Sequence, residues 1–332
     1  MIGALRRNPV VLWVTGLFAV LLAIAGSSAS GVPGPHLPRV FRLTSGPLRG
    51  HPLYASPHSQ AASAVHGGHP SPELTRLAAI PQGIWLTGGP PGTVARQVRQ
   101  VAGAAQRTHS VPVFVVYDIP RRDCGSGQSG GGAPNARAYR DYVSAIAFAD
   151  RGRPAIVVLE PDALAQIDCV PPRYRQGRYQ LLKWAVGALQ TRRVMVYLDA
   201  GNQGWHPPSV MAKRLSRAGI LHARGFAVNV SNFDPTSSEI AYGRAVSGLV
   251  GWKRFVIDTS RNGATPRPRG WCNPPSRAVG PLPGTNPHNR DVDALLWIKA
   301  PGESDGVCGT SRMPAGRFDR HAATRLMRDA GW

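Results

Sequence analysis

Four short hydrophobic runs in this chain lead directly into carboxylates. They are residues 113–118 (VFVVYD), 156–162 (IVVLEPD), 194–199 (VMVYLD) and 294–305 (ALLWIKAPGESD). Each run contains a hydrophobic stretch as long as a buried parallel strand, so its acids should follow the carboxyl end of that strand. In parallel α/β folds this edge of the sheet carries the active site. Several carboxylates on one edge indicate acid/base hydrolysis, in particular of glycosidic bonds.

The positions of these acids require a sheet that brings the strand ends together. From residue 73 onward, strand signals alternate with helix signals, which is typical of a parallel sheet with right-handed crossovers. The predicted strands are residues 83–87, 112–118, 154–160, 194–199, 225–230, 253–258 and 294–299. The predicted helices are residues 93–107, 136–150, 173–190, 208–218, 237–250 and 319–329. We expect an α/β fold of about seven strands, a distorted, partly open parallel β/α barrel similar to a TIM barrel.

The N-terminal segment has the features of an export signal. Arg6 and Arg7 precede an apolar stretch over residues 10–25, and small residues follow at 27–29. A signal peptide over residues 1–29 predicts a secreted protein. The alternative is an uncleaved membrane anchor, but the 16 apolar residues are fewer than the roughly 18 needed to span a bilayer. Residues 30–72 are rich in Pro, Gly, Ser and His and predict a lead that is mostly flexible and could be ordered near residues 52–54, so the catalytic domain is expected over residues 73–332.

The charge of the chain has two interpretations. The formal net charge is +21, and lysine supplies only four of the 39 basic residues. A nucleic acid or another anionic surface could bind such a protein, or the arginines could reflect a compositional bias. The basic residues are dispersed, without a run of five or six, which favours the bias. We therefore expect no nucleic-acid partner.

Four cysteines lie downstream of the predicted signal, namely Cys124, Cys169, Cys272 and Cys308. An even count in an exported chain predicts two disulfides, for which three pairings are possible. Pairing of neighbours along the chain is the simplest, and each bridge would contribute roughly 4 kcal/mol in the chain-entropy model. Four free thiols in a reducing compartment are the alternative. No zinc-type spacing and no P-loop pattern occur, so we expect neither a metal nor another cofactor.

Several segments resemble glycoside hydrolase family 6, which contains endoglucanases and cellobiohydrolases that cut β-1,4-glucan with inversion. The resemblance runs in the family's order from about residue 50 to 330. It is carried by residues 117–125 (YDIPRRDCG), 156–165 (IVVLEPDALA), 198–201 (LDAG), 229–232 (NVSN), 257–263 (IDTSRNG) and 297–306 (WIKAPGESDG). The implied partner is a β-1,4-glucan or a cello-oligosaccharide, and we expect a monomer.

The resemblance also implies roles for individual residues. Asp162 matches the general acid, and Asp123 matches a neighbour that raises the pKa of this acid and organises water. Asp305 matches the proposed base, although a water relay through Asp123 and Ser129 is an alternative. Tyr117 matches a tyrosine that distorts the reacting sugar.

Other positions match residues that bind sugar. They are Asp199, Asn232, Lys299 and Glu303, with Trp85, Trp205 and Trp271 as stacking platforms. Each tryptophan could instead belong to the core, and Lys299 could pair structurally with Glu303. We interpret Asp118 and Asp258 as strand-end caps or structural ion pairs, Asp141 and Asp150 as solvated, and Trp184, Trp252 and Trp297 as packing residues.

The chain departs from the family pattern in its loops. The 125–132 loop carries Gln128 where small residues are usual, and the stretch from 272 to 308 is short. A short stretch predicts an open cleft and internal cutting, hence an endoglucanase. Exo action of the cellobiohydrolase type, or a glycan-binding protein with little or no catalysis, are the alternatives.

Overall fold

The computed structural model describes residues 41–332, except residues 44–45, 69, 126 and 285–288. The predicted signal peptide and the first part of the predicted lead lie outside the described residues. Among the residues that are described, no helix is both long and apolar enough to cross a membrane.

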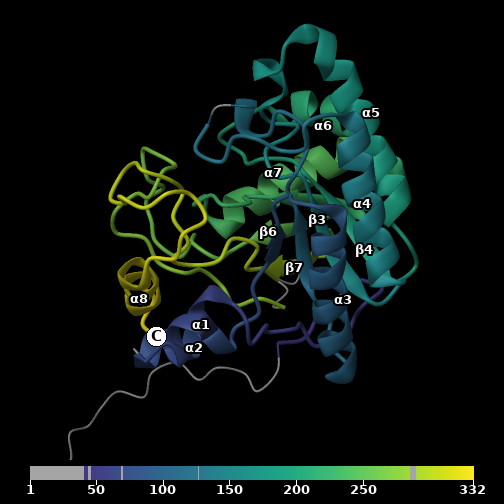
Figure 1. Ribbon diagram of the computed structural model, residues 1–332. Coiled ribbons are helices and arrows are strands. Elements are labelled where there is room, and N and C mark those ends of the chain that lie inside the picture. Colours follow the sequence, from purple (N-terminus) through teal and green to yellow (C-terminus); the bar gives the residue numbers. More distant parts are fainter. Residues whose placement is uncertain (1–40, 44–45, 69, 126, 285–288) are drawn as a thin grey trace, which may run out of the picture. The chain divides into compact units, whose positions relative to one another are not determined.

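Seven parallel strands form one curved sheet in chain order (Figure 1). They are β1 (Ile84–Leu86), β2 (Val113–Val116), β3 (Ala155–Leu159), β4 (Val194–Asp199), β5 (Gly225–Val228), β6 (Arg254–Asp258) and β7 (Val292–Leu296). In the described part of the chain no ladder joins β1 to β7. Single hydrogen bonds bridge this seam, from Gly83 N to Trp297 O at 2.8 Å and from Trp85 Nε1 to Ile298 O at 2.9 Å. The predicted partly open barrel is confirmed.

Both faces of the sheet are covered, which explains why its strands are continuously hydrophobic. Helices α3 (Pro91–Arg107), α4 (Ala136–Asp150), α5 (Pro172–Leu189), α6 (Pro208–Arg217) and α7 (Thr236–Leu249) follow successive strands. Their apolar residues, such as Val98, Tyr139 and Leu182, form one core with one face of the sheet. The other face forms a second core with α1 (Gln60–His66), α2 (Pro72–Ala79) and α8 (Arg320–Arg328), and these three helices lie together in Figure 1.

Part of the predicted lead is ordered. Helix α1 lies within residues 30–72, and α2 begins at Pro72. Ser59 and Ser71 cap these helices by accepting hydrogen bonds from Ala62 N and Leu74 N. Phe41, Leu43 and Leu53 are buried in the same core. The composition of this segment suggested flexibility, but a few apolar residues and two capping serines suffice to attach it to the sheet.

Three further predictions differ from the structure. The seventh strand is predicted at residues 294–299, but β7 runs from Val292 to Leu296. It begins earlier because Asp293, an acid that would normally mark a loop, is buried against Arg224 and Tyr197. Asp150 is not solvated, since it is only 5% exposed at the end of α4. Trp297 does pack inside the core, whereas Trp252 is 71% exposed at a turn with a positive φ.

Candidate active site

The segment that follows β3 carries Asp162. Both Glu160 (φ 52°) and Asp162 (φ 69°) have left-handed backbone conformations, which cost about 1–3 kcal/mol each and occur often at active sites. The buried Glu160 carboxylate accepts hydrogen bonds from Asp118 N at 3.0 Å and Ile119 N at 2.9 Å. These bonds hold the backbone after β2 against the backbone after β3.

Asp162 lies in an acidic, poorly solvated environment. Its backbone nitrogen donates to Asp199 Oδ2 at 2.9 Å. Burial raises the pKa of Asp162 well above its ordinary value, and the charges of Asp199, Asp123 and Asp305 raise it further, while Lys299 opposes them. Burial also raises the pKa of Asp199 to about 7. A carboxyl group in this position remains protonated near neutral pH and can donate its proton.

Asp123 belongs to a tightly constrained loop after β2. It begins the 3₁₀ helix η1 (Asp123–Gly125), and both Asp123 and Cys124 have positive φ. Asp123 Oδ2 accepts from Ser129 N at 2.8 Å, and Oδ1 accepts from Gln166 Nε2 at 3.2 Å. The disulfide Cys124–Cys169, with Cα atoms 5.6 Å apart, joins this loop to the segment after Asp162. Two covalently linked loops thus hold Asp123 and Asp162.

The loop after β2 contains two glycine motifs by spacing alone. Residues 125–130 fit the dinucleotide pattern Gly-x-Gly-x-x-Gly, and residues 127–131 fit the esterase pattern Gly-x-Ser-x-Gly. Both motifs require a glycine turn directly between a strand and a helix. Here the segment begins nine residues after β2 ends and stops before α4, so neither motif has its structural context. In the described ranges, no group of three or more His, Cys, Asp or Glu is arranged to hold a metal ion.

Two buried arginines that the sequence analysis did not identify support this region. Arg178 of α5 is 4% exposed and donates to Pro120 O and Arg121 O at 2.8 Å and to Ala163 O at 3.3 Å. Arg214 of α6 donates to Leu164 O at 2.8 Å and Ala165 O at 2.9 Å. Arg178 is one helical turn from Leu182 on the buried face of α5. That periodicity is the signal that could have revealed it.

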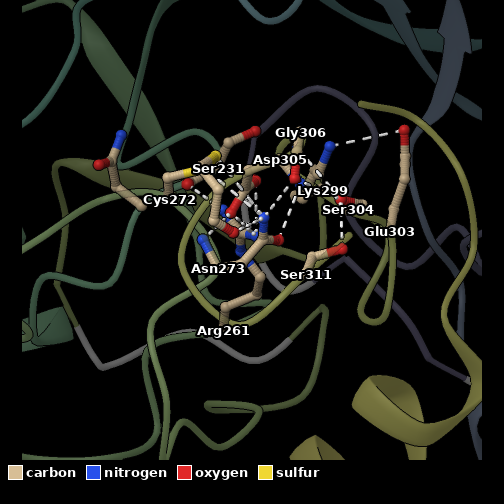
Figure 2. A network of polar contacts seen from close by, with 12 residues as sticks. Ser231, Arg261, Cys272, Asn273, Lys299, Glu303, Ser304, Asp305, Gly306 and Ser311 are labelled. Carbon is tan, nitrogen blue, oxygen red and sulfur yellow. Dashed lines mark hydrogen bonds and ion pairs between the residues drawn. A yellow bond between two sulfur atoms is a disulfide. The ribbon is translucent and has the colours of Figure 1, made fainter. Parts of the chain in front are cut away.

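Asp305 occupies the centre of a second network (Figure 2). Arg261 Nη1 lies 2.8 Å from Asp305 Oδ1 and 2.9 Å from Oδ2, and Asn273 N donates to Oδ2 at 3.0 Å. Arg261 is only 4% exposed and also donates to Ser231 O. The disulfide Cys272–Cys308 closes the same region, with Cα atoms 6.0 Å apart. Both oxygens of Asp305 are therefore already engaged.

Four of the predicted sugar-contacting residues lie together. The rings of Trp85 and Tyr117 meet edge to face, with centroids 5.4 Å apart. Lys299 Nζ lies 5.4 Å from the Trp85 ring and 3.5 Å from Glu303 Oε1. The buried Asp258 carboxylate accepts from Lys299 N at 3.0 Å, which agrees with its predicted structural role. Burial, and then the charge of Asp162, raise the pKa of Tyr117 above its ordinary value, so its hydroxyl stays protonated.

The remaining predicted residues are either exposed or held within their own loops. Trp271 is 58% exposed, and Trp205 is partly exposed with its ring stacked on His206 at a centroid distance of 6.4 Å. Exposed rings of this kind are available to a ligand. Asn232 Nδ2 donates to Val230 O at 3.0 Å, within its own turn. Ser129 contacts Asp123 through its backbone nitrogen.

Comparison with known proteins agrees with this geometry. A family model described as Glycosyl hydrolases family 6 matches residues 48–330. Endoglucanase A of Thermobispora bispora is 43% identical over 272 residues, which cover 78% of this chain and 59% of that protein. Endoglucanase 1 of Streptomyces sp. (strain KSM-9) is 42% identical over 266 residues, which cover 78% of this chain and 73% of that protein. This chain therefore spans less than two thirds of the Thermobispora enzyme.

A solved structure is also similar. The endoglucanase Cel6 from Mycobacterium tuberculosis, in complex with methyl-cellobiosyl-4-deoxy-4-thio-β-D-cellobioside, superposes with a TM-score of 0.83 at 45% identity. The match covers 87% of this chain and 100% of that chain. These findings confirm the predicted family, and the chain belongs to glycosyl hydrolase family 6, whose enzymes are inverting glycoside hydrolases.

Proposed function

We propose that this chain is an endo-β-1,4-glucanase that hydrolyses internal bonds of cellulose or a related β-glucan with inversion. The proposal is carried by one observation. Asp162 has a strongly raised pKa and lies among Asp199, Asp123 and Asp305 at the carboxyl edge of a parallel sheet. This arrangement provides a neutral carboxylic acid at physiological pH, surrounded by carboxylates that can stabilise positive charge on the sugar.

In the proposed reaction, Asp162 transfers its proton to the glycosidic oxygen as the bond from this oxygen to the anomeric carbon breaks. Water attacks the anomeric carbon from the opposite face, which inverts the configuration. The water proton must pass to a base. Arg261 and Asn273 donate to the oxygens of Asp305, and the adjacent Arg261 cation favours the ionised carboxylate, which makes Asp305 a weaker base.

Asp123 is the alternative acceptor, through a water relay. In the part of the chain that the structure describes, Asp123 forms no ion pair; instead it accepts hydrogen bonds from Ser129 N and Gln166 Nε2. Because no cation competes for its oxygens there, we favour the relay through Asp123. Asp305 then contributes negative charge that stabilises the oxocarbenium-like transition state.

The substrate would lie along the aromatic side chains. Trp85 and Tyr117 form one apolar wall, and Lys299 and Glu303 supply a charged donor and acceptor for sugar hydroxyls. Trp205 and Trp271 provide exposed rings on which further glucosyl units would stack. Internal cutting is supported by the short 272–308 stretch and by the similarity to two enzymes named endoglucanase.

We further propose that the protein is exported and loses residues 1–29. Support comes from the basic and apolar N-terminal pattern and from two disulfides, which persist in oxidising compartments. Expression of the full chain in a secreting host, followed by N-terminal sequencing of the product, tests this. A product that retains residues 1–29 and sediments with membranes would favour the anchor instead.

Activity on soluble carboxymethyl-cellulose tests the main proposal. The oxidised protein should lower the viscosity quickly while it releases reducing ends. Asp162→Ala should lower kcat by several orders of magnitude. Asp141→Ala is the matched control, because Asp141 is an exposed aspartate of α4 whose side chain is 60% exposed. Slow viscosity loss with steady release of cellobiose would indicate exo action. Oligosaccharide binding without any product would indicate a binding protein.

A further inference from the structure

A side-chain hydrogen bond connects the two loops that carry Asp123 and Asp305. Gln128 Oε1 accepts from Val307 N at 3.1 Å, across 179 positions of sequence. Gln128 lies in the loop after β2, and Val307 lies two residues beyond Asp305. The Gln128 side chain provides a contact that a smaller residue at this position would lack.

Within the loop after β2, Gln128 directly precedes Ser129, whose backbone N–H orients the Asp123 carboxylate. Ser129 N donates to Asp123 Oδ2 at 2.8 Å, and Ser129 O accepts from Arg122 Nε at 2.8 Å. The Arg122 guanidinium in turn lies 4.5 Å from the centroid of the Tyr117 ring. A shift of the backbone at Gln128 would therefore move the donor that orients the Asp123 carboxylate.

On the opposite side, Val307 belongs to a segment that is already rigid. Asp305 is held by Arg261 and Asn273, and Cys308 is bonded to Cys272. Gly306 provides the space for the incoming side chain. A Cβ atom at this position would lie 2.2 Å from Gln128 Oε1. The contact thus joins the loop with Gln128 to a segment that a buried ion pair and a disulfide hold in place.

We infer that Gln128 is a positioning residue that sets the loop after β2 against the Asp305 segment, so that Asp123 keeps its place beside Asp162 and the attacking water. This inference rests on the proposed function, because it concerns the same hydrolytic step. Gln128 itself touches no reacting atom. Its contribution is the amide oxygen that Val307 N–H binds.

Three substitutions at this position separate the amide oxygen from the bulk of the side chain. Gln128→Met keeps the length and removes the acceptor, Gln128→Ala also removes the bulk, and Gln128→Glu keeps an acceptor oxygen. With cellopentaose or cellohexaose as substrate, we expect kcat to fall about two- to tenfold in the Met and Ala variants, the effect of one exposed hydrogen bond. KM should change less than kcat, and Gln128→Glu should retain more of kcat than Gln128→Met.

A matched control and a double-mutant cycle complete the test. Gln106→Met is the control. Gln106 is another exposed glutamine, on the distant helix α3, and its Oε1 accepts from Arg153 Nε at 2.6 Å. This variant should leave kcat unchanged. Val307→Pro removes the donor instead of the acceptor. Its effect on kcat should not add to that of Gln128→Met, since both break the same bond.

The outcomes distinguish this inference from the proposed function. Additive effects of Gln128→Met and Val307→Pro, or a Gln128→Met variant with unchanged kcat, would overturn the inference while the wild-type enzyme still hydrolyses the substrate. A wild-type protein that is folded but inactive on every β-1,4-glucan would overturn the proposed function itself.

Discussion

The backbone nitrogen of Asp162 donates a hydrogen bond to Oδ2 of Asp199 at 2.9 Å, which ties the segment after β3 to the last residue of β4. Asp199 also accepts from Gly201 N at 3.1 Å. After burial, the negative charge of Asp199 is the largest influence that raises the pKa of Asp162. Asp199 therefore both fixes the acid and keeps it protonated.

Asp199→Asn should move the alkaline limb of the pH–rate profile to lower pH. An asparagine keeps an oxygen acceptor for Asp162 N but removes the charge, so Asp162 loses its proton more easily and the active, protonated form disappears at lower pH. We expect a displacement of about one pH unit, the size of a typical charge effect at close range. The measurement is kcat/KM against pH. An alkaline limb that does not move would show that Asp199 does not control the acid.

Arg261→Met tests whether Asp305 depends on its ion pair. The substitution leaves a buried carboxylate without its cation, which should reduce the free energy of unfolding by about 3–5 kcal/mol. The double variant Arg261→Met with Asp305→Asn should recover much of that stability, because no buried charge remains. Urea unfolding of the wild type, of the single variants Arg261→Met and Asp305→Asn, and of the double variant gives the comparison. If the single and double variants are equally unstable, packing rather than charge explains the loss.

Asp305→Asn, compared with Asp123→Asn, also tests which residue is the catalytic base. If the water relay through Asp123 operates, Asp305→Asn should lower kcat by less than Asp123→Asn does. If Asp305 is the base, Asp305→Asn should be as damaging as loss of the acid, and in the smaller variant Asp305→Ala a small anion such as azide should restore turnover by replacing the missing carboxylate. Steady-state kinetics with and without azide decide between these results.

Arg178→Met should lower kcat more than it raises KM. The arginine donates to three carbonyl oxygens in the segments that carry Asp123 and Asp162. Its loss leaves the buried Ala163 acceptor unpaired at a cost of about 1–3 kcal/mol and releases the two partly buried acceptors. In the smaller variant Arg178→Ala, added guanidinium at millimolar concentration should restore part of kcat. Arg137→Met serves as the control, because Arg137 of α4 has a side chain that is 93% exposed. Failure of guanidinium to restore activity in a folded Arg178→Ala protein would contradict a positioning role.

Asp150→Asn should stabilise the protein near neutral pH. Burial raises the pKa of Asp150 to about 6, although the nearby Arg153 and Gly152 oppose this shift. The native state therefore binds this proton more tightly than the unfolded chain, whose aspartates have a pKa of about 4. Stability from this group is fully present below pH ~4 and is lost as the pH rises from ~4 to ~6. We expect a gain of about 1–3 kcal/mol for the variant at pH 7, and none at pH 4, from thermal unfolding at both values.

The strands and their terminal acids could be predicted because each gives a local signal. Strands β2, β3 and β4 are continuous hydrophobic runs; Asp199 ends β4 and Asp162 closely follows β3, whereas Asp123 lies farther along the loop after β2. The supporting cations could not be predicted in this way. Arg178, Arg214 and Arg261 are bound by carbonyl or carboxylate oxygens from distant segments. Helical periodicity places Arg178 on the buried face of α5, but it does not reveal which oxygens the arginine binds.

Helix α1 and the burial of Asp150 were missed for a related reason. The helix is short, and its stability comes from packing with α2, which in turn contacts α8, rather than from its own composition. Asp150 ends helix α4, at a position where an acid is normally solvated. Here residues of β3 and α5 lie beside it and bury it. In both cases tertiary contacts outweigh local preference.

The contact between Gln128 and Gly306 has a consequence for how this lineage can change. A side chain at 306 would occupy the space of the Gln128 amide, and its φ of +136° further favours glycine there. Substitutions at these two positions are therefore not independent in evolution. A smaller residue at 128 leaves room beside position 306, whereas a larger residue at 306 would prevent a later return of glutamine at 128. Ancestral reconstruction should thus find glycine at 306 before glutamine at 128.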